Sequence, residues 1–108
     1  MFGIFGRRGS AMSMQEAMEA RKQDPNILLI DVRTPAEYRQ GHIPGSISLP
    51  LDAWERIGEV ASDKHTPIFV YCLSGARSQA ACRGFQGLGY DSVTNIGGIS
   101  AYEGPLEK

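Results

Sequence analysis

The sequence predicts an α/β fold with a mostly parallel sheet, and three observations support this class. Short apolar runs alternate along the chain with stretches of helical periodicity, which is the order of elements in α/β domains. Residues 27–30 and 67–71 are apolar runs, as expected for strands that are buried on both faces. The 108 residues provide for one hydrophobic core, so the chain is predicted to form a single domain.

The first predicted helix starts at a capping box in residues 13–16, where a serine hydroxyl and a glutamate carboxylate are three positions apart. It should end before Pro25, because the residue preceding a proline is disfavoured in the α conformation. Residues 27–30 then form a buried strand that ends at Asp31. A second capping box in residues 34–37 has a proline at the first helical position and starts a short second helix.

The remaining elements continue the same alternation of helix and strand. A short strand is expected at residues 46–49, and a helix begins at Asp52. Residues 67–71 form the second buried strand, which runs directly into a cysteine. The following helix should span residues 78–88, and a last strand, 93–96, is ended by two glycines. The apolar face of that helix is expected to carry Ala81, Phe85 and Leu88.

Composition and charge exclude several functional classes. A net charge of −1 lacks the basic excess of a nucleic-acid surface, so no nucleic-acid partner is predicted. No run of apolar residues is long enough to span a membrane. The two cysteines cannot build a disulfide scaffold or a four-cysteine zinc site, and we expect them to stay reduced in the cytoplasm. Residues 1–12 are predicted to be a flexible tail, followed by one domain at 13–108 that is expected to be monomeric.

The strongest chemical signal is the loop from Cys72 to Ser78, between a buried strand and a helix. Ligands of open α/β sheets bind at the carboxyl ends of strands, where Cys72 lies. Backbone N–H groups of the loop and the helix N-terminus can bind an anion there. Arg77 adds a positive charge, and Gly75 permits a tight turn. The hydroxyls of Ser74 and Ser78 can donate hydrogen bonds, so the loop favours the thiolate form of Cys72.

A cysteine in such a loop can carry a second sulfur atom. A lone cysteine at a strand end is more often a small buried apolar residue, but the glycine, arginine and serines at these offsets favour a reactive site. A persulfide holds its negative charge on the outer sulfur, so the groups that stabilise the thiolate also stabilise the persulfide. Transfer then follows thiol–disulfide exchange, with one sulfur attacking another, and requires no metal or organic cofactor.

Three segments resemble the rhodanese homology domain, in its order and spacing. They are residues 31–38, 41–47 and 71–78, and the resemblance covers about residues 13–104. It implies a five-stranded, mainly parallel sheet with helices on both faces. It also implies a sulfurtransferase that takes sulfur from thiosulfate, or from a protein or small-molecule persulfide, and passes it to cyanide or a thiol.

The resemblance also implies roles for individual residues. Cys72 would be the catalytic sulfur carrier, and Arg77 would bind the anionic part of the donor. Asp31 and Arg33 would tie the neighbouring strand end to the loop, and an ion pair between Arg33 and Glu37 is expected. The N–H groups that bind the persulfide would be those of Leu73, Ser74, Gly75, Ala76, Arg77 and Ser78.

Two other functions remain open. The first is a persulfide-delivery or binding module that works only with a protein partner. The second is a small phosphatase or arsenate reductase on the same fold. Related phosphatases have a loop one residue longer than the six residues from Cys72 to Arg77, so loop length favours sulfur over phosphate chemistry.

Structural rather than catalytic roles are predicted for three further side chains. Cys82 is predicted to be a partly buried helix residue off the apolar face rather than a resolving thiol, because a disulfide requires close Cα atoms. His42 matches a family position that is mostly structural. Tyr102 lies near a place where the family commonly has a tryptophan, which predicts a slightly looser C-terminal lid.

Overall fold

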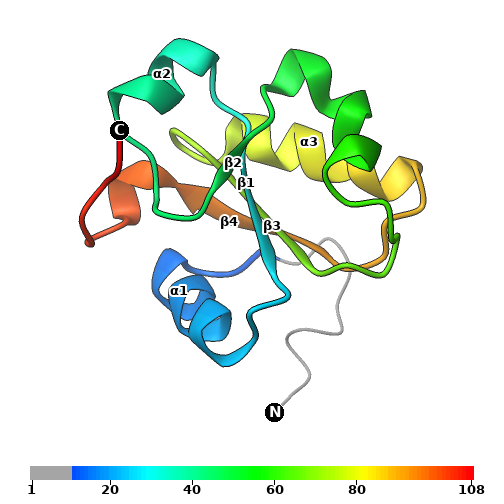
Figure 1. The fold of residues 1–108 in the computed structure, drawn as a ribbon, viewed down its shortest axis with the longest axis horizontal. Helices are drawn as coiled ribbons and strands as arrows, with labels where there is room; N and C mark the ends of the chain where they lie inside the picture. The colour runs from blue at the N-terminus through cyan, green and yellow to red at the C-terminus, as the bar shows by residue number, and fades with distance from the viewer. Residues whose placement is uncertain (1–10) are drawn as a thin grey trace.

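The structure is a computed structural model, and it describes residues 11–108 (Figure 1). Its elements alternate between helix and strand as the sequence predicts. The α-helices are α1 (Met14–Gln23), α2 (Pro35–Gln40) and α3 (Ala76–Gly87). The strands are β1 (Leu28–Asp31), β2 (Ile47–Ser48), β3 (Ile68–Cys72) and β4 (Val93–Gly98). Two 3-10 helices complete the set, η1 (Leu51–Glu59) and η2 (Ile99–Ala101).

The four strands form one parallel sheet in the order β2-β1-β3-β4. The chain moves outward from β1 to β2 and then returns to the other side of β1 to form β3. The carboxyl ends of β1 and β3 are therefore neighbours at the point where the strand order reverses, which is where open α/β sheets bind ligands. Helices cover both faces of this sheet, with α1 on one side and η1 and α3 on the other (Figure 1). The predicted α/β class is confirmed.

The expectation of five strands is wrong for the described residues, which contain four. The fifth position, beside β4, holds only a single parallel bridge between Ala11 and Asn95. The Met12 N–H donates to the Asn95 carbonyl at 3.1 Å, and Ser13 already caps α1, so the contact is too short to form a strand. Ala11 and Met12, assigned to the tail from the sequence, thus lie against β4. The rest of that predicted tail, residues 1–10, lies outside the described residues.

Both predicted capping boxes are present. Ser13 Oγ accepts a hydrogen bond from the Glu16 N–H at 3.1 Å, and the Glu16 carboxylate accepts one from the Ser13 N–H at 3.0 Å. Thr34 and Glu37 make the same reciprocal pair at 3.2 and 2.8 Å. Each box satisfies two backbone donors that a helix start leaves unpaired, so both helices begin where the sequence predicts.

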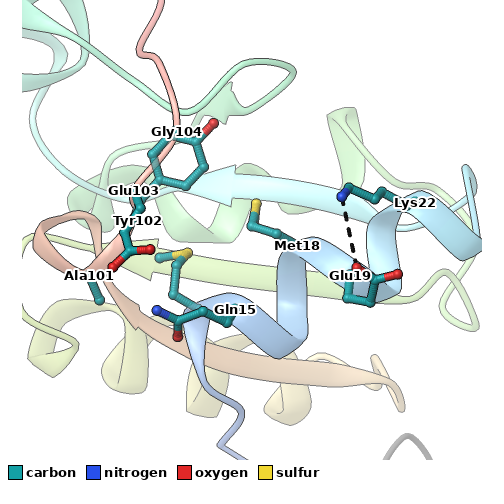
Figure 2. Close-up of a pocket in the computed structure, with 9 residues that line it drawn as sticks. Gln15, Met18, Glu19, Lys22, Ala101, Tyr102, Glu103 and Gly104 are labelled. Carbon is teal, nitrogen blue, oxygen red and sulfur yellow. Dashed lines mark ion pairs between the residues drawn. The ribbon is translucent and has the colours of Figure 1, made fainter.

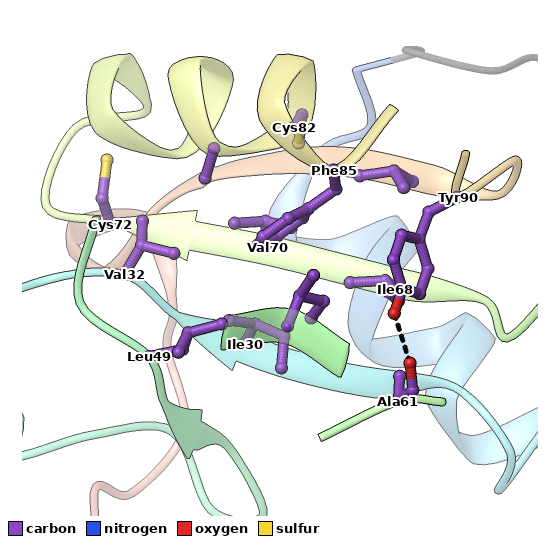
Figure 3. Close-up of a cluster of buried hydrophobic side chains, with 13 residues drawn as sticks. Ile30, Val32, Leu49, Ala61, Ile68, Val70, Cys72, Cys82, Phe85 and Tyr90 are labelled. Carbon is purple, nitrogen blue, oxygen red and sulfur yellow. Dashed lines mark hydrogen bonds between the residues drawn. The ribbon is translucent and has the colours of Figure 1, made fainter. Parts of the chain in front are cut away.

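The sheet separates two buried clusters. Alternate residues of β3 point to opposite faces, so Ile68, Val70 and Cys72 belong to the cluster under α3 (Figure 3). Phe69 and Tyr71 belong to the cluster under α1. All five residues of β3 are buried, as the apolar run predicts.

The buried face of α3 differs from the prediction. Its buried residues are Ser78, Ala81, Cys82 and Phe85. Cys82, expected to be partly buried and off the apolar face, is only 5% exposed and belongs to the core. Leu88 is 39% exposed, because α3 ends at Gly87 and the chain turns through Gly89 at φ +101°. Tyr90 fills the core in its place and packs edge-on against Phe85, with ring centroids 6.5 Å apart.

Two further details differ from the sequence-based expectation. The element that begins near Asp52 is a 3-10 helix with a kink at Ala53 rather than a regular α-helix. Gly97 and Gly98 do not end the last strand but belong to β4. Within residues 11–108, no helix is long and apolar enough to cross a membrane.

Candidate active site

Cys72 is the last residue of β3, and its side chain lies beneath the loop that follows. The Gly75 N–H donates a hydrogen bond to Cys72 Sγ at 2.9 Å, and Ser78 Oγ lies 3.5 Å from the same sulfur. Cys72 is 1% exposed, whereas the next residue, Leu73, is 50% exposed at the surface of the loop. The sequence-predicted loop therefore surrounds one sulfur atom with hydrogen-bond donors.

This environment lowers the pKa of the Cys72 thiol. Burial by itself raises the pKa, since it disfavours the charged form. Hydrogen bonds from the Ser78 hydroxyl and from the backbone N–H groups of Ser78, Gly75 and Ser74 outweigh burial. The second thiol behaves in the opposite way, because burial and the charge of Cys72 raise the pKa of Cys82 to about 12. Of the two thiols, only Cys72 has a lowered pKa, which is the condition that favours the thiolate.

Three glycines from two elements shape the loop. Gly75 adopts φ +106°, a conformation that favours glycine, and serves as the N-cap of α3. Gly98 is level with Cys72 in the neighbouring strand β4. A Cβ atom at Gly98 would collide with the Leu73 carbonyl oxygen and lie 2.8 Å from the Ser74 Cα. Gly97 Cα lies 3.5 Å from the Cβ position of Gly75, so the glycine pair of β4 makes room for the loop.

The ion pairs around the site differ from the expected one. Arg77 Nη1 and Nη2 donate to the two carboxylate oxygens of Glu37 at 2.7 and 3.1 Å, which joins α3 to α2. These bonds, with those from Thr34, lower the pKa of Glu37 to about 2. The predicted Arg33–Glu37 pair is wrong, because Arg33 turns back to the Asp31 carboxylate at the end of β1.

Asp31 and Arg33 form a buried unit at the end of β1. Arg33 donates from Nη2 to Asp31 Oδ2 at 2.7 Å, from Nε to both carboxylate oxygens at 3.1 Å, and from its backbone N–H at 2.9 Å. The same Nη2 also donates to the Gly41 carbonyl at 2.7 Å. Since the Val32 N–H bonds the Tyr71 carbonyl, this unit stands directly beside the strand end that carries Cys72.

Asn95 is a site residue that the sequence analysis did not identify. It lies in β4, and its side chain bonds Ser78 and the backbone of Gly75 and Gly97 around the loop. Its only sequence signal is an asparagine inside a predicted strand, a position where this residue type is depleted. Its partners are up to 20 residues away in the chain, so no local pattern links them.

The side chains of His42 and Tyr102 contact residues outside the Cys72 loop. The His42 ring stacks on Tyr38 with centroids 3.7 Å apart, and its Nδ1 lies 2.9 Å from the Tyr38 carbonyl oxygen. Tyr102 lies beside α1, where it lines a surface hollow of about 270 Å³ with Met18 and Lys22 (Figure 2). None of the predicted site residues lines that hollow.

Among residues 11–108, no three histidine, cysteine or acidic side chains come together as a metal ion would require.

Another hollow touches the loop at Arg77. Its volume is about 400 Å³, and Arg77 forms one wall. The other lining residues are Val32, Thr34, Pro35, Pro50, Leu51 and Asp52. The walls are mainly apolar, with the single cation already paired to Glu37.

Comparison with known families identifies this arrangement. Residues 14–104 match the rhodanese-like domain. The chain belongs to the rhodanese-like domain family. A sulfurtransferase of Allochromatium vinosum is 41% identical over 90 residues, which cover 81% of this chain and 82% of that protein. Thiosulfate sulfurtransferase PspE of Escherichia coli is 39% identical over 80 residues, covering 73% of this chain and 77% of that protein.

The fold agrees with solved structures of the same family. A rhodanese from E. coli, solved with anions, superposes with a TM-score of 0.67 at 36% sequence identity. The match covers 76% of this chain and 98% of that one. These relatives support sulfurtransferase activity for this rhodanese-like protein at the level of the family.

Proposed function

We propose that this protein is a sulfurtransferase that carries a sulfane sulfur as a persulfide on Cys72. The observation that carries the proposal is the Gly75 N–H pointing at Cys72 Sγ from 2.9 Å, in a loop whose other N–H groups also favour a negative sulfur. The same donors would stabilise the outer sulfur of a persulfide. The proposed site consists of Cys72 and the loop residues Leu73, Ser74, Gly75, Ala76, Arg77 and Ser78, supported by Asp31, Arg33 and Glu37.

The reaction consists of two substitutions at sulfur. The Cys72 thiolate attacks the outer sulfur of thiosulfate, the S–S bond of thiosulfate breaks, and sulfite leaves with the electron pair. Cyanide or a thiolate then attacks the outer sulfur of the Cys72 persulfide and releases the Cys72 thiolate. No net redox change occurs on the protein, so the steps require no further cofactor. We place the protein in the cytoplasm, where both thiols would remain reduced, and we expect it to be a monomer.

The test is an intact-mass measurement after incubation with thiosulfate. We expect one added sulfur atom, located on Cys72 by peptide mass and removed by cyanide. Cys72→Ala should gain no sulfur while keeping its melting temperature within a few degrees, since backbone groups shape the loop. Cys82→Ala is the matched control and should still be loaded. A protein whose Cys72 is alkylated readily but never gains sulfur would disprove the proposal.

The alternative of a module that works with a protein partner is favoured by two observations. Arg77, the cation of the loop, is already neutralised by Glu37, which weakens attraction for a small anion. Leu73 is half exposed beside the reactive cysteine, where an apolar contact from a partner could form. Loading of Cys72 from a persulfidated protein, much faster than from thiosulfate at equal concentration, would support this version of the function.

A further inference from the structure

The Asn95 side chain connects the two segments that surround Cys72. Its Nδ2 donates to the Gly75 carbonyl at 3.0 Å, and its Oδ1 accepts the Gly97 N–H at 2.9 Å. The same Oδ1 lies 2.7 Å from Ser78 Oγ. An irregularity in the β3–β4 register, which places one extra residue in β4 between Asn95 and Gly98, accompanies this arrangement.

The backbone determines which way the Asn95 amide points. A backbone N–H can only donate and a carbonyl can only accept, so Oδ1 must face Gly97 and Nδ2 must face Gly75. Asn95 Oδ1, which lies 2.7 Å from Ser78 Oγ, is therefore an acceptor, and the Ser78 hydroxyl must supply the hydrogen of that bond. The Gly75 carbonyl, 3.0 Å from Ser78 Oγ, is also an acceptor.

The Ser78 hydroxyl thus has one hydrogen and three neighbours that could receive it, the third being Cys72 Sγ at 3.5 Å. While Asn95 holds the hydrogen, Ser78 presents a lone pair to Cys72, which suits the neutral thiol. A thiolate or a persulfide requires the hydroxyl to rotate its hydrogen toward sulfur. Asn95 Oδ1 keeps the Gly97 N–H when this happens, so the rotation leaves no buried group unpaired.

We propose that Asn95 is a positioning residue that competes with Cys72 for the single Ser78 hydroxyl hydrogen and so controls how readily Cys72 ionises. The inference rests on the proposed function, in which the ionised sulfur is the nucleophile. Asn95 acts through Ser78 and does not contact the reacting sulfur.

The charged groups near Cys72 come from three other elements and leave this competition intact. On β1, Asp31 is paired with Arg33, and on α2, Glu37 is paired with Arg77 from the start of α3. Cys82, also on α3, remains neutral, since its pKa is about 12. Replacing Asn95 removes none of these pairs, so a change in Cys72 ionisation reports on the Ser78 hydrogen.

The experiment is the rate of Cys72 alkylation by iodoacetamide as a function of pH, with the modified cysteine identified by peptide mass. In Asn95→Ala the shortest acceptor contact of the Ser78 hydroxyl is removed and only the Gly75 carbonyl still competes with the sulfur, so the pKa of Cys72 should fall by about 0.5–1 unit, the equivalent of one hydrogen bond. A merely structural role predicts the opposite sign, because loss of the bond to Gly75 would loosen the loop and weaken the Gly75 N–H contact to sulfur. Asn95→Leu keeps a side chain of similar size without a hydrogen-bond acceptor. It serves if the alanine variant does not fold, and it should lower the pKa of Cys72 by the same amount.

A double-mutant cycle completes the test. Ser78→Ala should raise the pKa of Cys72, and adding Asn95→Ala to it should leave that pKa unchanged, because no hydroxyl hydrogen remains to be released. A rise in Asn95→Ala alone, no change, or equal effects of Asn95→Ala with and without Ser78 would overturn the proposal. Alkylation does not require sulfur transfer, so a protein that titrates as expected but never gains sulfur from thiosulfate would count against the proposed function alone.

Discussion

Arg77 and Glu37 show how one neighbour changes the role of a residue. The resemblance to rhodaneses assigns Arg77 to the anionic part of the donor, but two hydrogen bonds hold its guanidinium to Glu37. An anionic donor must therefore compete with a carboxylate for Arg77. Glu37 would thus reduce the affinity of the site for thiosulfate.

Glu37→Gln should free Arg77 and lower the KM for thiosulfate by about two- to fivefold, the range of a partly exposed ion pair. Glutamine can still serve the capping box, so α2 should remain in place. The measurement is steady-state sulfur transfer to cyanide. Glu59→Gln is the matched control, because Glu59 makes a similar bidentate pair with Arg56 on η1 and should leave the KM unchanged. A KM equal to that of the wild type in Glu37→Gln would show that Arg77 does not bind the donor.

The same pair predicts a pH dependence of stability. The pKa of Glu37 is about 2 in the folded protein against an ordinary 4.5, so the carboxylate stabilises the fold above pH 4.5. This stabilisation should be lost as the pH falls from 4.5 toward 2. Melting temperatures of the wild type and Glu37→Gln should therefore differ at pH 7 and converge in that acidic range. A constant difference from pH 7 to pH 2 would contradict the assignment of the low pKa to Glu37.

At the scale of elements, the Cys72 loop depends on β4, a strand that follows the loop in the sequence. Gly98 lies in β4, 24 residues after Ser74, yet its backbone lies against Leu73 and Ser74. The close approach leaves no space for a side chain. The shape of the Cys72 loop is therefore a property of the β3–β4 pair as well as of the loop sequence.

Gly98→Ala should displace the loop and reduce sulfur loading of Cys72 strongly, with a loss of about 1–3 kcal/mol in the free energy of unfolding. The measurements are intact mass after thiosulfate and urea unfolding. Gly87→Ala, on α3, is the control, because its Cβ would meet nothing within 4 Å. It should be neutral or stabilising by up to about 1 kcal/mol. Full loading of the Gly98→Ala protein would mean that the loop tolerates the displacement.

At the scale of the whole molecule, the order of the strands brings Cys72 and Asp31 to adjacent strand ends at the reversal of the sheet. Two clusters, one on each face of the sheet, hold this arrangement together. Phe85 is fully buried in one of them, with Tyr90 packed against its ring. Cys72 belongs to the same cluster as Phe85, so the position of the strand end that carries Cys72 depends on the packing of this core.

Phe85→Ala should lower the free energy of unfolding by about 3–5 kcal/mol, a large fraction of the 5–15 kcal/mol typical of a domain. Leu88→Ala should cost less than about 1 kcal/mol, because much of that side chain is already in water. Urea unfolding followed by fluorescence measures both. Similar losses from the two substitutions would mean that Leu88 belongs to the core after all.

Several features were predictable because their cause is local. Ser13 and Glu16, or Thr34 and Glu37, are three residues apart, and each pair satisfies the backbone of its own helix start. The apolar run that became β3 predicted a strand buried on both faces. The surroundings of Cys72 were predictable for the same reason, since one short segment contains the cysteine and the N–H groups that point at its sulfur.

Other features depend on which residues the folded chain brings close together. Spacing along the chain does not identify the carboxylate partner of a long arginine side chain, and in the folded protein Arg33 pairs with Asp31 while Arg77 pairs with Glu37. Leu88 continues the helical periodicity of Phe85, but the helix ends before it and Tyr90 takes the core position. Periodicity says which residues share a face only while the helix continues.

The sequence by itself determined the α/β class, the helix starts and a loop able to hold a negative sulfur on Cys72, because these depend on neighbouring residues. Only the tertiary structure decided the number of strands, the partner of Arg77, the burial of Cys82 and the contact of Asn95 with Ser78. Those depend on which segments the sheet brings together, and side chains then pair with whichever group lies within hydrogen-bond reach.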